Sequence, residues 1–313
     1  MIKRTLCFSN PAYLSLRNSQ LVVKMPELEK TNVPNRLKQE AVRTIPIEDI
    51  GVVLLDHKQI TTTQALLEAL LENNCAIITC DSNHLPVGLM LPLCGNTTQS
   101  ERFRDQIDAS LPLKKQLWQQ TIQYKIRNQA AVLQQVNGSV ARNMLAWAAD
   151  VKSGDSDNLE ARAAAFYWRN LFADRPDFVR DREGEMPNNL LNYGYAILRA
   201  VVARALVASG MLPTLGIHHH NRYNAYCLAD DIMEPYRPYI DALVVDICHK
   251  GLVSDTLTTD LKRELLQIPT LDVVIGGRRS PLMVAVAQTT ASLYKCYSGE
   301  LRKISYPEIE QNT

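Results

Sequence analysis

The chain has 313 residues, of which 46% are hydrophobic and 21% charged, a composition typical of folded globular protein and long enough for one large domain or two ordinary ones. Its net charge of +1 gives no general indication of a nucleic-acid partner, and its seven scattered cysteines form no C-x-x-C pair, which argues against a zinc knuckle and favours a reducing compartment. No stretch reaches 18 apolar residues without a charge, and no signal-peptide pattern follows the first residues, so we expect a cytoplasmic protein without a membrane span.

The first 95 residues are typical of a β domain. Short runs rich in β-forming residues, separated by turn-forming Asn, Ser and Pro, predict strands at 2–8, 13–16, 21–25, 43–47, 52–55, 75–80 and 87–91. Residues 17–20 should close a hairpin between the second and third strands. Leucines on one face predict a helix at 62–72, and the charged, proline-containing residues 26–41 predict a long loop.

From Gly95 the pattern changes to helical periodicity. Residues 95–100 are a candidate linker, and apolar residues at helical spacing then predict helices at 113–135, 140–151, 158–172, 190–209, 231–250, 258–267 and 281–298. The helix at 190–209 is apolar nearly all round, which indicates a buried central helix. We therefore predict a small β domain over 1–95 and a larger all-α domain over 96–313.

Residues able to bind a metal are concentrated between positions 215 and 238. This segment contains three consecutive histidines, His218, His219 and His220, and three acids, Asp230, Asp231 and Glu234. At most one or two of the histidines can point toward one site, whereas the acids lie at helical spacing and can share a face. Two prolines directly after the acids predict a kink. Mixed imidazole and carboxylate ligands suit Mg²⁺ or Mn²⁺ better than structural zinc. Alternatively, the acids only cap a helix start and the histidines are surface residues.

A second candidate is Glu160, at the start of the helix predicted at 158–172 and next to alanines that allow close helix approach. Taken alone, an acid in the first turn of a helix is common and needs no further role. The motifs of phosphate-binding loops and of serine hydrolases, G-x-x-x-x-G-K-[ST], G-x-G-x-x-G and G-x-S-x-G, are absent from the sequence, so nucleotide and serine hydrolysis have no support.

Positive charge is concentrated near the end of the chain. Residues 275–304 carry Arg278, Arg279, Lys295, Arg302 and Lys303 against Glu300 alone, a local charge of +4. The segment is either a solvated face or a surface that contacts phosphates.

Four motifs follow one another along the chain: Ser153-Gly-Asp155 through Asn158-x-Glu160-x-x-Ala-Ala-x-x-Tyr167-Trp168, then Leu191-Asn-Tyr-Gly-Tyr195, then Gly216-x-x-His219, then Leu228-Ala-x-Asp-Ile-Met-Glu-Pro-Tyr-Arg-Pro238. In this order they resemble the CRISPR adaptation integrase, the first-numbered CRISPR-associated protein family, especially its type II variants. The resemblance covers the whole chain. It implies an α+β fold, with a small β-sandwich-like N-terminal domain that dimerises and a larger helical catalytic domain.

The resemblance also implies a site and a reaction. The metal ligands of the family fall on Glu160, His219 and Glu234, with Asp231, Asn192 and Arg237 in support. Magnesium or manganese bound there would stabilise charge on a phosphodiester that a DNA 3′-hydroxyl attacks, which inserts new spacers into a CRISPR array. His219 could instead act as a general acid or base. With water as the nucleophile, the same site would cleave DNA.

The implied partners are double-stranded DNA, a second copy of the chain and a bridging dimer of the second-numbered CRISPR-associated protein. In type II systems, the effector nuclease and a DNA-clamping protein also take part. Arg278, Arg279 and Lys295 are the candidate DNA-binding residues. Aromatic residues near the motifs, namely Tyr167, Trp168, Tyr193 and Tyr195, either stack on bases or, as their helical spacing favours, belong to the core.

Two other functions stay open on the sequence alone. One is a DNA-binding assembly subunit with a degenerate site, against which the presence of all three ligand types argues. The other is an unrelated metal-dependent phosphohydrolase acting on small substrates, against which the absence of phosphate loops and the order of the motifs argue.

Overall fold

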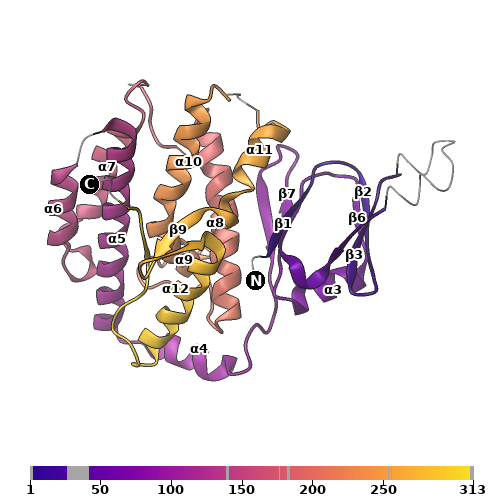
Figure 1. The fold of residues 1–313 in the computed structure, drawn as a ribbon. Coiled ribbons are helices and arrows are strands. Elements are labelled where there is room, and N and C mark those ends of the chain that lie inside the picture. The colour runs from indigo at the N-terminus through magenta and orange to yellow at the C-terminus, as the bar shows by residue number, and fades with distance from the viewer. Residues whose placement is uncertain are drawn as a thin grey trace. The chain divides into compact units, whose positions relative to one another are not determined.

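The computed structural model describes residues 3–26, 42–138, 141–175, 177–181, 184–252, 254 and 256–310. It divides into two compact units, residues 1–95 and 96–313, which are drawn as one ribbon in Figure 1. The long loop expected at 26–41 lies outside the described residues, apart from Pro26.

Two four-stranded sheets build the first unit. The first sheet has the order β1-β5-β7-β8, with β1, β5 and β7 parallel and β8 antiparallel at its edge. The second has the order β4-β3-β2-β6, and its β2–β3 hairpin turns at Asn18 and Ser19, both at positive φ, which confirms the predicted turn. The strands are β1 (Arg4–Phe8), β2 (Ala12–Arg17), β3 (Gln20–Lys24), β4 (Arg43–Pro46), β5 (Ile50–Leu55), β6 (Ile60–Thr62), β7 (Ala76–Cys80) and β8 (Pro86–Met90).

One core joins the two sheets to helix α3 (Gln64–Glu72). Alternate residues of the strands point into it, as period-two patterning requires. The buried members come from both sheets and from α3, and include Leu14, Leu21, Ile50, Val53, Leu66, Leu70 and Ile77. The β-sandwich-like architecture is therefore confirmed.

The second unit is mostly helical, as predicted. Its α-helices, among the described residues, are α4 (Gln99–Asp108), α5 (Leu111–Asn137), α6 (Arg142–Asp150), α7 (Leu159–Leu171), α8 (Asn188–Ala208), α9 (Cys227–Met233), α10 (Arg237–His249), α11 (Thr259–Leu265) and α12 (Leu282–Tyr297). The predicted linker at 95–100 runs into α4, which sequence patterning missed because Gln106 is the one buried residue of this largely polar helix. The helix predicted at 231–250 is interrupted by a single 3-10 turn, Glu234–Tyr236, and Pro235 stands in this predicted kink.

A small sheet also belongs to the second unit, which was predicted as all-α. Its strands are β9 (Asp272–Ile275), β10 (Arg278–Pro281) and β11 (Pro307–Glu308), paired antiparallel in the order β10-β9-β11. Strands of two to four residues are too short to show a period in sequence, so patterning did not reveal them.

Helix α8 is the buried central helix that the sequence predicted. Among the described helices it is the one long and apolar enough to cross a membrane, but most of it is buried inside the protein, and a core helix passes the same test. Gly194 lets α10 approach closely, since a Cβ there would meet the Ile240 Cγ2 atom at 2.6 Å. This contact packs α8 against α10, the helix that begins at Arg237.

Candidate carboxylate–histidine site

Glu160 is positioned by an acid that caps its helix. Both carboxylate oxygens of Asp155 accept hydrogen bonds from the first turn of α7, from the backbone N–H of Leu159 at 2.9 Å and from that of Glu160 at 3.0 Å. Free amides at a helix start need such acceptors, and a carboxylate there also complements the helix dipole. The Glu160 side chain is partly exposed.

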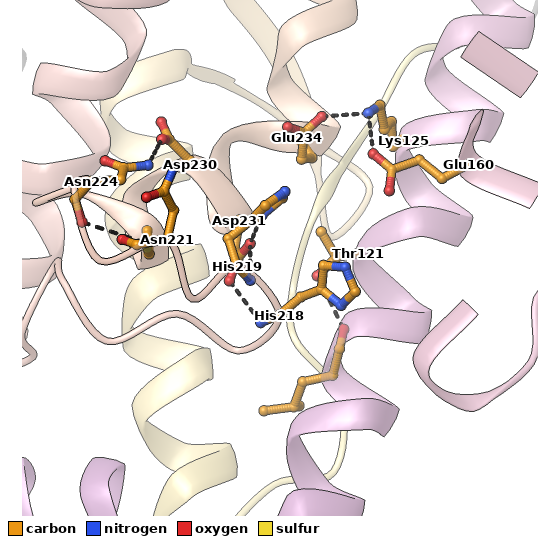
Figure 2. A network of polar contacts seen from close by, with 12 residues as sticks. Thr121, Lys125, Glu160, His218, His219, Asn221, Asn224, Asp230, Asp231 and Glu234 are labelled. Carbon is orange, nitrogen blue, oxygen red and sulfur yellow. Dashed lines mark hydrogen bonds and ion pairs between the residues drawn. The ribbon is translucent and has the colours of Figure 1, made fainter. Parts of the chain in front are cut away.

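Lys125, in the middle of α5, lies between two carboxylates from distant parts of the chain. Its Nζ atom is 2.6 Å from Glu160 Oε1 and 2.6 Å from Glu234 Oε2. Both contacts are drawn as dashed lines in Figure 2. Burial lowers the pKa of Lys125, but Glu234 and Glu160 raise it by more, so the ammonium stays charged. Glu160 and Glu234 thus converge on one cation, here an ammonium group.

Glu234 begins the 3-10 turn between α9 and α10 and is buried. Its Oε1 atom is 2.9 Å from Arg237 Nε, an ion pair one turn further along. Burial raises the pKa of Glu234, whereas Arg237 and Lys125 lower it by more, so the carboxylate is ionised. Its Oε2 atom is 2.6 Å from Lys125 Nζ, so each oxygen of this carboxylate faces a cationic side chain.

His219 is held by Asp231, a fully buried acid in α9. The His219 Nδ1 atom contacts Asp231 Oδ1, which leaves Nε2 as the ring nitrogen able to take a proton or a metal. The hydrogen bond to Asp231 raises the pKa of His219, burial opposes this, and the net shift is upward. The negative charges of Glu234 and Glu160 raise the pKa of His219 further, because both glutamates lie within electrostatic reach of its ring.

The three consecutive histidines take different environments, as their adjacency predicts. The His218 ring stacks on Trp118 with ring centroids 4.2 Å apart and planes 1° apart. Its pKa is lowered by burial and by His219. His220 is exposed. The loop before them is close to Asp231, because a Cβ on Gly216 would meet the His219 carbonyl oxygen at 2.4 Å and Asp231 Oδ2 at 2.8 Å.

A buried polar network lies behind Arg237. The Arg237 guanidinium lies over the Tyr195 ring, 4.7 Å from the ring centroid. The hydroxyls of Tyr195 and Tyr167 both donate to the buried carboxylate of Asp241. Burial raises the pKa of Asp241 to about 7, although both hydroxyls and Arg237 lower it. These contacts restrict the movement of Arg237 beside Glu234.

The other residues singled out in the sequence make contacts of their own, and Asn192 is linked to the network around Asp241 through Arg180. Asn192 accepts a hydrogen bond from Arg180 at 2.6 Å and donates to the Asp181 carbonyl. The candidate DNA-binding residues Arg278 and Arg279 are exposed on β10, and Lys295 is exposed on α12. Their roles, and that of Asn192, stay predictions.

The aromatic residues near the motifs are mainly core. Tyr167 and Tyr193 are fully buried and Tyr195 nearly so, which confirms the prediction for these three and removes them as base-stacking surfaces. Trp168 is partly buried and packs against Tyr167 and Phe178.

Sequence reasoning missed Lys125. A signal was present, because Lys125 lies on the buried face of α5, beside Ile122 and Ile126, where a lysine needs a partner. Three residues on, Asn128 links separate segments by donating to the Pro235 and Pro307 carbonyls at 2.8 and 3.0 Å.

The donor set suits a divalent cation of the Mg²⁺ or Mn²⁺ type: two carboxylates, one of them buried, and an imidazole. Over the residues that the structure describes, no three His, Cys, Asp or Glu side chains already form a cluster able to hold an ion. The Lys125 ammonium group lies between the carboxylates of Glu160 and Glu234, in contact with both.

Fold and site together define a two-unit protein, a β-sandwich-like unit followed by a helical unit with a carboxylate–histidine centre. The chain matches the family model described as CRISPR associated protein Cas1 over residues 6–269. It therefore belongs to the Cas1 family, as the motifs predicted.

The chain is also similar in sequence to named Cas1 proteins. The chain is 34% identical over 311 residues to the CRISPR-associated endonuclease Cas1 of Neisseria meningitidis serogroup C, covering 99% of this chain and 97% of the relative. It is 27% identical over 269 residues to a CRISPR-associated endonuclease Cas1 of Pyrobaculum aerophilum, covering 82% and 90%.

Solved structures share the fold. A casposase bound to an integration product superposes with a TM-score of 0.80 at 20% identity, covering 100% of this chain and 96% of that one. A Cas1 protein from Thermotoga maritima gives 0.74 at 13% identity, covering 95% and 98%. A chain of a Cas6-RT-Cas1–Cas2 complex gives 0.74 at 18% identity, covering 99% of this chain and 36% of that longer one.

Proposed function

We propose that this chain is a metal-dependent DNA integrase and endonuclease that inserts new spacers into a CRISPR array. The observation that carries the proposal is the convergence of Glu160 and Glu234 on one cation, with His219 within electrostatic reach. Relatives named as CRISPR-associated endonucleases support the nuclease activity, and the fold shared with a casposase bound to an integration product is in keeping with strand transfer.

In the proposed reaction, a DNA 3′-hydroxyl attacks a phosphodiester of the repeat, forming one P–O bond and breaking another. Glu160, Glu234 and His219 would hold Mg²⁺ or Mn²⁺, which when bound supplies charge stabilisation for the phosphate and lowers the pKa of the attacking hydroxyl. Arg237 keeps Glu234 ionised, and Asp155 fixes the helix start that presents Glu160.

His219 has a second possible role in the same proposal. The Nδ1 atom of His219 contacts Asp231, so His219 would accept or donate a proton through its Nε2 atom. The hydrogen bond to Asp231 raises the pKa of His219 and so favours the protonated imidazolium, the form that gives a proton.

Partners complete the proposal. Double-stranded DNA is the substrate, and Arg278, Arg279 and Lys295 are the proposed phosphate contacts. The chain would form a homodimer through its β unit, and a Cas2 dimer would bridge two such homodimers. A related fold occurs in a Cas6-RT-Cas1–Cas2 complex. The type II effector nuclease and a DNA-clamping protein are further proposed partners, and the cytoplasm is the proposed compartment, in keeping with seven free cysteines.

A strand-transfer assay tests the function. The full chain is mixed with its Cas2 partner, a short duplex and a plasmid that carries a repeat, with Mn²⁺ or with chelator. We expect His219→Ala to lower product formation by about 10²–10⁴-fold, the usual loss for a general acid–base or ligand residue. His220→Ala is the matched control, because it removes an adjacent imidazole that is exposed like His219 but is not a candidate ligand, and it should keep wild-type activity. Equal product from wild type and His219→Ala would contradict the proposal.

A further inference from the structure

We propose that Lys125 is a positioning residue that holds the place of the divalent cation: its ammonium group assembles Glu160 and Glu234 without metal and must leave them when metal binds. The inference rests on the proposed metal site and adds a residue and a competition to it.

The geometry places one cation at the centre of the site. Lys125 Nζ lies 2.6 Å from an oxygen of each acid, and these acids come from α7 and from the turn after α9. Lys125 and Glu234 are both buried, so neither charge is well solvated. Without a cation, the buried carboxylate of Glu234 and the partly exposed carboxylate of Glu160 would repel each other, and an unpaired buried charge is strongly destabilising. Lys125 therefore keeps the site assembled while no metal is bound.

The same geometry makes Lys125 a competitor. Magnesium binds carboxylate oxygens at about 2.0–2.1 Å and requires a nearly regular octahedron of ligands around it. Glu234 has one oxygen against Arg237 and the other against Lys125, so a metal that uses this carboxylate meets a cationic side chain at either oxygen. Two cations in contact with the same pair of oxygens repel each other, so one of them has to move.

Charge balance favours removal of one side-chain cation. The carboxylates of Glu160, Asp231 and Glu234 carry three negative charges, against two positive charges on Lys125 and Arg237. With His219 neutral, a divalent cation added to these five side chains would leave the site with an excess positive charge. If the cation replaces the Lys125 ammonium, the site is neutral.

Lys125 is the side chain that can yield. Arg237 is one turn from Glu234 in the same segment, stands over the Tyr195 ring and lies against the network around Asp241. Lys125 reaches the acids from a separate helix through a flexible four-carbon stem and makes point-charge contacts without a planar fork. Its ammonium can swing away without any change in backbone.

Calorimetric binding of Mn²⁺ alone to the full chain at one fixed pH tests the competition. We expect Lys125→Met to bind Mn²⁺ about tenfold more tightly than wild type, because the competing cation is gone. Lys125→Arg keeps the charge and should gain nothing. Arg199→Gln is the matched control, because it removes a cation that pairs with the neighbouring Asp230 at 2.6 Å and does not lie between the two candidate ligands, so no comparable gain is expected.

Thermal unfolding gives a readout independent of activity. Without metal, Lys125→Met should unfold at a lower temperature than wild type, and saturating Mn²⁺ should raise its Tm by more than that of wild type, by about 2–4 °C for each tenfold gain in affinity. Lys125→Gln, which keeps a hydrogen-bond donor without the charge, replaces Lys125→Met in both measurements if the latter does not fold.

The outcomes are distinct. Equal or weaker Mn²⁺ binding by the neutral variants than by wild type overturns the role of Lys125 and leaves the proposed function standing. Folded wild type and neutral variants that all fail to bind Mn²⁺ overturn the metal site itself and, with it, both proposals. Tighter binding by the neutral variants, with Lys125→Arg near wild type, supports both.

Discussion

Asp231 holds His219 at two points: its Oδ1 atom contacts the ring Nδ1 of His219 and lies 3.3 Å from the backbone nitrogen of the same residue. The other oxygen of Asp231 accepts a hydrogen bond from the backbone N–H of His218 at 2.9 Å. One buried carboxylate thus determines both where the loop runs and which ring nitrogen of His219 is available. Partners of this kind orient ligands and proton-transfer groups as strongly as direct contacts do.

Asp231→Asn should lower strand-transfer activity by about 10–100-fold, the usual loss when an orienting partner is changed. The same substitution removes the hydrogen bond to a carboxylate that raises the pKa of His219, so that pKa should fall. Titration of the histidine ring protons by NMR measures it. Asp230→Asn is the control, because Asp230 pairs with Arg199 and Asn224. An unchanged His219 pKa in Asp231→Asn would show that Asp231 does not act in this way.

Asp155→Ala should loosen the start of α7. Two backbone N–H groups, those of Leu159 and Glu160, lose their acceptor, so the free energy of unfolding should fall by about 1 kcal/mol. Activity should fall as well, because Glu160 is in the turn that frays. Denaturant unfolding and the strand-transfer assay measure the two effects. Asp157→Ala removes a nearby exposed acid paired with Lys152 and should change neither by much.

Gly216→Ala should displace the loop that carries His219. The added Cβ would meet the His219 carbonyl oxygen at 2.4 Å and Asp231 Oδ2 at 2.8 Å, and neither is the free end of a flexible chain. We expect activity to fall by more than tenfold, roughly the effect of a misplacement of about 1 Å near the chemistry. Gly251→Ala is the control: its Cβ meets nothing within 4 Å, and the strain of an alanine at its positive φ of 70° acts just after the end of α10, so activity should be kept although stability falls. Full activity of Gly216→Ala would contradict the tight packing.

Asp241 should make stability depend on pH. Burial raises its pKa to about 7, whereas an unfolded aspartate ionises near pH 4. Between these values the folded chain holds a proton that the unfolded chain has lost, so the stability contributed by Asp241 falls as pH rises from about 4 to about 7. Asp241→Asn removes this dependence at the site. The free energy of unfolding of the variant relative to wild type should therefore rise from about pH 5 to about pH 8, measured by denaturant unfolding at each pH. A constant difference over this range would contradict the raised pKa.

Much of the fold was predictable because its signals are local. Runs rich in β-forming residues predicted every described strand of the first unit except the three-residue β6, and apolar stripes predicted the longer helices of the second, including buried α8. Elements without a local signal were missed: α4 presents one buried residue to its neighbours, and β11 has two residues. For these elements, tertiary contacts decide the structure in place of propensity.

By itself, the sequence determined the family, through four ordered motifs, and singled out Glu160, His219 and Glu234. Only the tertiary structure decided that Asp231 orients His219 and that Lys125 stands between the two glutamates. The reason is physical. A motif records spacing within a few helical turns, whereas the Lys125 contacts join α5 to segments 35 and 109 positions further along the chain. Such contacts exist only once these segments have packed, and no local period encodes them.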